Sequence, residues 1–148
     1  MSAAGVYVHI PFCSSRCSYC DFATGLYQRE LAERYVSAIV QEIASTGFVG
    51  ERVDTIYFGG GTPSLLEPSQ LDRIVSSLHD RFRIEQTAEI TLEINPGSAT
   101  PEKLREFRRL GINRASFGAQ TFDDAELAKL GRSHTAADAL RTFADLRN

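Results

Sequence analysis

Short apolar strands and amphipathic helices alternate along the whole chain, and this alternation restricts the possible folds more than any other feature of the sequence. The spacing of apolar residues predicts strands at residues 6–10, 53–58, 88–94 and 113–117. It predicts helices at residues 29–46, around 71–78, from 101 to about 110, and in shorter stretches at 124–130 and 136–146. Four βα units in series require a parallel sheet with right-handed crossovers, so the sequence predicts an α/β fold.

Local signals indicate where several helices begin and which side of the first one is buried. Ser64 and Glu67 resemble a capping box for the second helix, and Thr100 before Pro101 predicts the start of the third. One buried face of the first helix is predicted from the spacing of Leu31, Tyr35, Ala38, Ile39 and Ile43.

Three of the predicted strands have one apolar side and one polar side. In the first strand the apolar residues at 6, 8 and 10 alternate with Tyr7 and His9. In the third strand the polar residues are Glu89, Thr91 and Glu93. Parallel sheets with helices on both faces are apolar on both sides, so the polar side predicts a face that lines a ligand cavity. A partial (β/α) barrel with a polar ligand in its lumen explains this pattern.

All three cysteines of the chain, Cys13, Cys17 and Cys20, lie within eight residues, directly after the first strand. Three thiolates on one loop can hold three corners of a four-iron cluster and leave the fourth iron open. A zinc site is the alternative, with His9 or Asp21 as the fourth ligand. A disulfide would leave one thiol over, and no secretory signal precedes the loop, so reduced thiols and a cytoplasmic location are expected.

Further chemistry-bearing residues follow the ends of the other strands. A triple glycine that includes Gly60 and Gly61 ends the second strand, Glu93 lies near the end of the third, and Gln120 lies just after the fourth. In barrels of parallel strands the active site is built at this rim, and glycines let backbone groups approach a ligand closely. These residues are therefore expected to share one site with the cysteines.

Composition excludes several classes of function. The 148 residues carry a formal net charge of −3, and Lys and Arg are scattered singly along the helices, so no nucleic-acid partner is expected. No apolar run is long enough to cross a membrane, and membrane association is not indicated. No linker divides the chain, so one domain, or part of one, is expected.

Five motifs together resemble the radical S-adenosylmethionine (SAM) proteins. Within them, the chain is most similar to the branch of anaerobic coproporphyrinogen III oxidases and HemW-type haem chaperones. The motifs, in chain order, are YVHIPFCSSRCSYCDF at residues 7–22, YFGGGTPS at 57–64, EINP at 93–96, NRASFGAQ at 113–120 and LGRSH at 130–134. The resemblance implies the N-terminal part of a radical SAM partial barrel.

The resemblance also implies cofactors, site residues and partners. A [4Fe-4S] cluster would be bound by Cys13, Cys17 and Cys20, and its open iron would bind SAM, which one electron cleaves to a 5′-deoxyadenosyl radical. The SAM site would consist of Tyr7, Tyr19, Gly60, Gly61, Thr62, Glu93, Gln120 and Arg132. The implied partners are a haem or porphyrin ligand, a haem-acceptor protein and an electron donor such as flavodoxin or ferredoxin.

One departure favours the haem chaperones over the oxidases. The oxidases carry a further cysteine two residues after the third, whereas this chain has Asp21 and Phe22 after Cys20. The resemblance therefore implies haem delivery, with oxidative decarboxylation of coproporphyrinogen III as the alternative. A zinc-stabilised binding module without radical chemistry is the alternative of another class.

A second departure concerns length. Members of this branch run to several hundred residues and carry a C-terminal His-Asn-x-x-Tyr-Trp haem-binding motif, whereas this sequence of 148 residues has no tryptophan. Residues 1–148 are therefore expected to be the N-terminal portion of the core domain of a longer protein. An unpaired edge is expected at the fourth strand.

Overall fold

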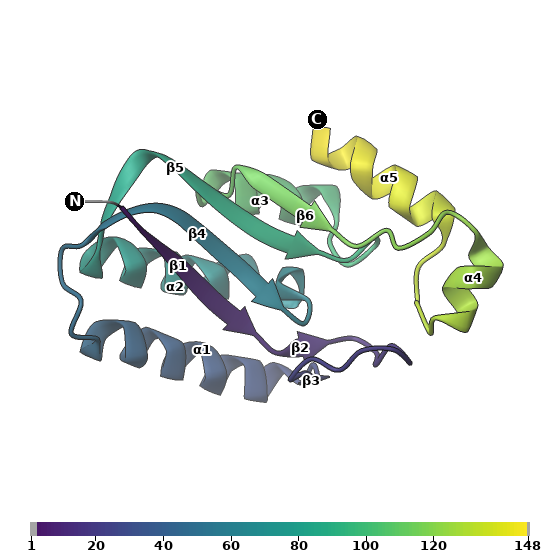
Figure 1. Ribbon diagram of the computed structural model, residues 1–148, viewed down its shortest axis with the longest axis horizontal. Coiled ribbons are helices and arrows are strands. Elements are labelled where there is room, and N and C mark those ends of the chain that lie inside the picture. The colour runs from purple at the N-terminus through teal and green to yellow at the C-terminus, as the bar shows by residue number, and fades with distance from the viewer. Residues whose placement is uncertain (1–2, 148) are drawn as a thin grey trace.

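The computed structural model of this protein describes residues 3–147 and contains a four-stranded sheet in which all strands are parallel (Figure 1). The strand order is β1 (Ala4–Ile10), β4 (Arg52–Gly60), β5 (Arg83–Ile94) and β6 (Arg114–Phe117). The predicted α/β fold with a parallel sheet is confirmed. The outer strands are β1 and β6, and within the described part of the chain nothing pairs with the far side of β6.

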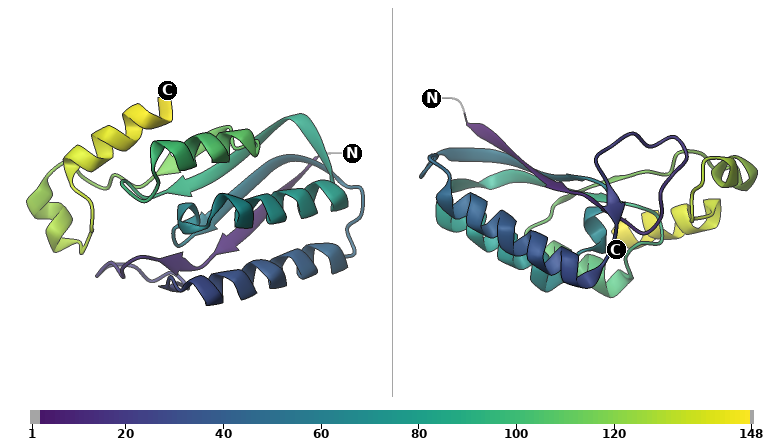
Figure 2. Two further views of the ribbon diagram at one scale, coloured as in Figure 1. Left: turned by 180° about the vertical axis from the view of Figure 1, so that it is seen from behind. Right: turned by 90° about the horizontal axis from the view of Figure 1, so that it is seen from below.

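Three helices lie on the same face of the sheet (Figure 2). They are α1 (Arg29–Ser45), α2 (Pro68–Arg81) and α3 (Pro101–Arg109). The remaining elements lie toward the carboxyl ends of the strands, and the last helix also packs against α3. These elements are β2 (Phe12–Cys13), β3 (Gly25–Leu26), the 3-10 helix η1 (Pro63–Leu65), α4 (Asp124–Lys129) and α5 (Ala136–Arg147). Between residues 3 and 147, no helix is both long enough and apolar enough to span a membrane.

The core lies between the sheet and these three helices. Its central strand residues are Ile10, Ile56, Phe58, Leu92 and Ile94, all at most 3% exposed. The alternate residues point to the opposite face, where Tyr7 is 59% exposed. The prediction of one apolar and one polar strand side is therefore correct, because the helices of the described chain cover one face only.

One local prediction is correct in part and another is wrong. Tyr35, Ile39 and Ile43 of helix α1 pack against the core as expected, whereas Leu31 is 43% exposed. The fully buried residues of α1 are Ala32 and Val36. Ser64 does not cap α2, because it lies in η1. Helix α2 instead begins after Glu67, whose backbone N–H donates to the side chain of Gln70 (2.9 Å).

The start of α3 follows the prediction, and it provides a test of local stability. Thr100 Oγ1 accepts a hydrogen bond from the N–H of Lys103 (3.3 Å), and Pro101 is the first helical residue. Thr100→Ala leaves that N–H without its acceptor, so we expect the free energy of unfolding to fall by about 1 kcal/mol. Urea denaturation measures this change, and Thr100→Ser is the control that keeps the cap. Equal midpoints for the Ala and Ser variants would contradict the capping role.

Candidate functional site

The carboxyl ends of all four strands meet at one cavity of about 250 Å³. Its walls come from the loop after β1, the end of β4, the end of β5, and the segments that follow β6 and α4. The lining includes most of the predicted site, namely Cys13, Cys17, Tyr19, Cys20, Gly60, Gly61, Glu93, Gln120 and Arg132. Segments that are far apart in the sequence therefore form one pocket, as the position of the motifs at the strand ends predicts.

The cysteine loop is held to the fold at both ends and at its middle. The N–H of Gly25 donates to Pro11 O (2.7 Å), and the N–H of Tyr27 donates to Cys13 O (2.9 Å). In the middle, the N–H of Ser18 donates to Leu130 O (3.3 Å), beyond the end of α4. All three thiols are free and partly exposed, and all three line the pocket. The loop therefore presents three available sulfur ligands to one cavity.

The thiols are not arranged around a single ion. Among residues 3–147, no group of three or more His, Cys, Asp and Glu side chains has the arrangement of a one-ion site. His9 is also engaged, because its Nε2 lies 3.1 Å from Ala23 O and its Nδ1 lies 3.3 Å from the hydroxyl of Tyr7. In an iron–sulfur cluster the thiolates bind separate irons, so they need not converge on one point. To bind zinc, His9 would have to leave both of these contacts, whereas a cluster held by the three cysteines leaves them intact.

The glycine motif packs directly against the cysteine loop. The N–H of Gly61 donates to Ile10 O (2.8 Å), and the N–H of Thr62 donates to Phe12 O (2.6 Å). A Cβ atom at position 61 would lie 2.6 Å from Phe12 O, so only glycine permits this approach. Gly60 has a φ of +115° and donates its N–H to Glu93 Oε2 (3.0 Å). These three N–H groups are therefore already used within the protein.

The Glu93 carboxylate is held between two donors. One oxygen accepts from the N–H of Gly60, and the other accepts from the hydroxyl of Tyr57 (2.7 Å). Burial raises the pKa of Tyr57, and the hydrogen bond to Glu93 raises that pKa further. Tyr57 therefore stays neutral and keeps the carboxylate fixed on the pocket wall, with acceptor capacity left for a cationic or hydroxyl-bearing ligand.

Arg132 lies across the pocket from the glycine motif and contacts the cysteine loop. Its Nη1 lies 3.5 Å from Cys17 Sγ, and its Nη2 donates to Gly118 O (2.6 Å) and to Asn95 Oδ1 (3.4 Å). Its Nε is buried and has no hydrogen-bond partner. Three of the five guanidinium N–H groups are thus used, and the second N–H of Nη1 remains for an anionic ligand group.

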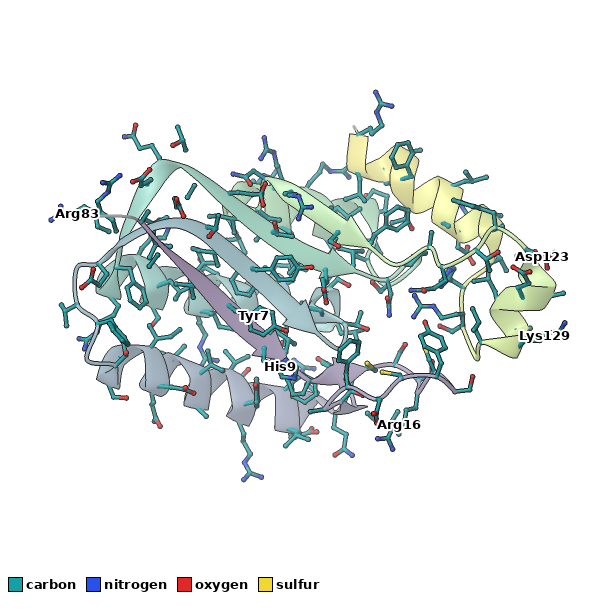
Figure 3. The ribbon with its side chains drawn as sticks, in the orientation of Figure 1. Tyr7, His9, Arg16, Arg83, Asp123 and Lys129 are labelled. Atoms are coloured by element: carbon teal, nitrogen blue, oxygen red, sulfur yellow. The ribbon has the colours of Figure 1, made fainter. Side chains whose placement is uncertain are left out.

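Tyr7 and Thr62, both predicted site residues, lie outside the lining of the cavity. Tyr7 lies on the polar face of β1 beside His9, before the chain reaches the cysteine loop (Figure 3), and its ring stacks on Tyr57 with centroids 6.0 Å apart. Thr62 is 1% exposed, and its hydroxyl lies 3.8 Å from Cys13 Sγ. The two residues flank the site without facing its cavity.

The sequence did not identify every residue that organises the pocket. Asn95 contacts both Thr62 and Arg132, and Tyr57 fixes Glu93. Asn95 follows Glu93 by two residues, just past the end of β5, so a continued alternation would place both side chains on one side, a signal that could have revealed it. Gln120 adopts a left-handed backbone with φ of +63°, the only positive φ of a non-glycine residue in the described chain. Such strain occurs preferentially at functional sites.

His134 is a buried titratable side chain that lines the pocket. It is 6% exposed, and its Nε2 lies 3.3 Å from Ala119 O. Burial lowers the pKa of His134; the carbonyl of Ala119 opposes this shift, Arg132 adds to it, and Asp138 opposes it. Because burial dominates, His134 stays neutral in the folded protein at pH values where the unfolded chain binds a proton.

We therefore expect the free energy of unfolding to decrease as the pH falls below about 6.5, the ordinary value for histidine. The decrease should level off once the pH lies below the folded-state pKa of His134. Urea denaturation between about pH 5 and pH 8 measures this slope. His134→Gln, which cannot titrate, should reduce it, and an unchanged slope in that variant would assign the dependence to other groups.

Comparison with known proteins agrees with this geometry. The Radical SAM superfamily model matches residues 7–148. The chain is 42% identical over 129 residues to the "Heme chaperone HemW" of Lactococcus lactis subsp. lactis (strain IL1403), covering 87% of this chain and 34% of that protein. It is 40% identical over 148 residues to the "Radical S-adenosyl methionine domain-containing protein 1, mitochondrial" of Mus musculus, covering 97% of this chain and 33% of that protein.

A solved structure is also similar. The coproporphyrinogen III oxidase HemN of Escherichia coli, described as a radical SAM enzyme, superimposes with a TM-score of 0.90 and 30% sequence identity. The match covers 97% of this chain and 34% of that one. The chain thus spans about a third of the length of the relatives that it matches.

Proposed function

Since this chain belongs to the radical SAM superfamily, we propose that it forms part of a HemW-type protein that delivers haem to acceptor proteins. Residues 1–148 would be the N-terminal portion of the radical SAM core domain. A radical SAM domain implies a [4Fe-4S] cluster and SAM. Haem, the haem acceptor and an electron donor such as flavodoxin or ferredoxin are the further partners of the proposal.

The observation that carries the haem-delivery proposal is the agreement between the relatives and the cysteine loop. Relatives named "Heme chaperone HemW" include proteins that are 43%, 37%, 35% and 32% identical to this chain, and the oxidase HemN is 30% identical. The oxidases also carry a further cysteine, two residues after the third cysteine of the loop. Phe22 lies at that position and is 70% exposed. An exposed phenylalanine cannot supply a fourth thiolate, which favours the chaperone branch.

The residues of the pocket fit a cluster with SAM. Cys13, Cys17 and Cys20 offer three free thiols from one loop to one cavity, which leaves one iron of a four-iron cluster without a cysteine. The guanidinium of Arg132, which lines the cavity, offers a remaining donor to a carboxylate. When bound, the cluster would supply the electron for reductive cleavage of SAM.

The remaining residues would bind and orient SAM. Glu93, fixed by Tyr57 and Gly60, would accept hydrogen bonds from hydroxyl or ammonium groups. The carbonyl oxygens of Gly60 and Gly61 would face the ammonium group. Tyr19 and Gln120 would close the pocket over the ligand. Tyr7 and Thr62 lie outside the cavity lining, so we propose that they support this wall rather than touch SAM.

Anaerobic reconstitution tests the proposal. We expect about four irons and four sulfides per chain, little zinc, and an EPR spectrum of the reduced protein that shifts when SAM is added. For haem delivery, the complete protein should bind haem and transfer it to a haem-free acceptor. Zinc without sulfide would overturn the cluster, and haem binding without transfer would overturn the delivery function.

Oxidative decarboxylation of coproporphyrinogen III is the second candidate, because the HemN fold matches with a TM-score of 0.90. It predicts loss of carboxyl groups from that substrate when the complete protein receives SAM and a reductant. The chaperone proposal predicts no such turnover. Product analysis by mass spectrometry distinguishes the two functions.

A further inference from the structure

Three side chains form a continuous hydrogen-bonded chain between two of the cysteines. The hydroxyl of Thr62 lies 3.8 Å from Cys13 Sγ, and Asn95 Nδ2 donates to Thr62 Oγ1 (2.8 Å). Asn95 Oδ1 accepts from Arg132 Nη2 (3.4 Å), whose Nη1 lies 3.5 Å from Cys17 Sγ. The chain crosses the pocket from the end of β4, over the end of β5, to the segment after α4.

Arg132 fixes the direction of every hydrogen bond in this chain. A guanidinium has only donors, so the carbonyl oxygen of the Asn95 side chain must face it. The Asn95 NH₂ group therefore faces Thr62 and donates to its oxygen. A threonine hydroxyl has one proton, and here that proton remains for Cys13 Sγ. Both ends of the chain consequently donate to sulfur.

The polar groups of Thr62 are all used inside the protein. Its N–H donates to Phe12 O, its carbonyl accepts from the N–H of Leu65 (2.9 Å), and its hydroxyl bridges Asn95 and Cys13. The residue is 1% exposed, so water does not compete for these bonds. Thr62 is therefore built to contact the cysteine rather than a ligand in the cavity.

We propose that Thr62, Asn95 and Arg132 act as positioning residues that donate hydrogen bonds to the cluster ligands Cys13 and Cys17 and thereby raise the reduction potential of the cluster. This inference rests on the proposed function, because it requires that the cysteines bind a [4Fe-4S] cluster. Reduction adds one negative charge to a cluster, and donors at its sulfurs stabilise that charge. The burial of Thr62 strengthens its effect, since the local dielectric constant is low.

Thr62→Val tests the chain, because it keeps the shape of the side chain and removes the proton. The reconstituted protein is titrated with dithionite at controlled potentials, and the reduced cluster is measured by EPR. At a fixed potential we expect the ratio of reduced to oxidised cluster to fall about tenfold, which corresponds to about 59 mV for one electron. Thr62→Ser should restore the original ratio. Thr91→Val is the matched control, because Thr91 is also 1% exposed but contacts Arg114 and Glu89 instead of a cysteine.

Asn95→Asp provides an independent variant if Thr62→Val does not assemble a cluster. An aspartate has no donor, so the Thr62 proton would turn toward it and away from Cys13, and a negative charge would be added nearby. We expect a fall in the ratio at least as large as for Thr62→Val, with iron and sulfide unchanged. If the ratio of reduced to oxidised cluster is unchanged in these variants, or falls equally in Thr91→Val, the proposed effect of the hydrogen-bonded chain on the reduction potential is wrong. Absence of sulfide from the unmodified protein would instead overturn the proposed function itself.

Discussion

Cys17→Ala is expected to abolish cluster assembly, with iron falling from about four atoms per chain to fewer than about one after reconstitution. Cys17 is the middle cysteine of the loop, and no fourth cysteine in the 148 residues can replace it. Its sulfur also accepts a hydrogen bond from Arg132 Nη1 (3.5 Å), so the loss of Cys17 removes one end of the hydrogen-bonded chain across the pocket. Iron and sulfide analysis measures the effect directly.

The matched control is Ser15→Ala, a change in the same loop that removes no sulfur. It should retain the full iron content. Before reconstitution, the free energy of unfolding of Cys17→Ala should lie within about 0.5 kcal/mol of that of the unmodified protein, because Cys17 is only partly buried. Full iron content in Cys17→Ala, or an equal loss in Ser15→Ala, would contradict the assignment of this cysteine as a ligand.

The fold could be predicted from the sequence because the two hydrophobic periods are regular. Strands with a period of two and helices with a period of 3.6 alternate four times, and such a pattern permits few arrangements other than a parallel sheet. The start of α3 was predictable because Thr100 and Pro101 act locally. The buried face of α1 was predictable only in part, since apolar residues occupy both sides of its core-facing line. Packing against the sheet, rather than spacing alone, decides that Ala32 is buried and Leu31 exposed.

The site, like the fold, was predictable only where the signal is local in the sequence. The spacing of three cysteines in eight residues and the position of Glu93 near a strand end revealed the pocket. The contacts within it depend on tertiary structure. Arg132 reaches a cysteine that precedes it by 115 residues, and Thr62 reaches one that precedes it by 49. Local sequence patterns carry no information about such pairs, so the hydrogen-bonded chain was visible only in the folded protein.

Gly61→Ala is expected to destabilise both the fold and the site. A Cβ at this position would lie 2.6 Å from the oxygen, 2.9 Å from the carbonyl carbon and 3.0 Å from the nitrogen of Phe12. These are backbone atoms of a residue that is 2% exposed, so neither side can yield without moving β4 away from the cysteine loop. We expect the free energy of unfolding to fall by about 3 kcal/mol, as for overpacking at a site that cannot relax.

Gly47→Ala is the matched control for this substitution, because nothing lies within 4 Å of a Cβ built at Gly47. Its free energy of unfolding should change by no more than about 1 kcal/mol. The displacement at Gly61 also separates the N–H of Thr62 from Phe12 O and moves the Thr62 hydroxyl relative to Cys13. The surviving folded Gly61→Ala protein should therefore hold less iron after reconstitution than Gly47→Ala does. Equal urea midpoints and equal iron in the two variants would show that the glycine motif and the cysteine loop are not coupled, because the same close contact accounts for both losses.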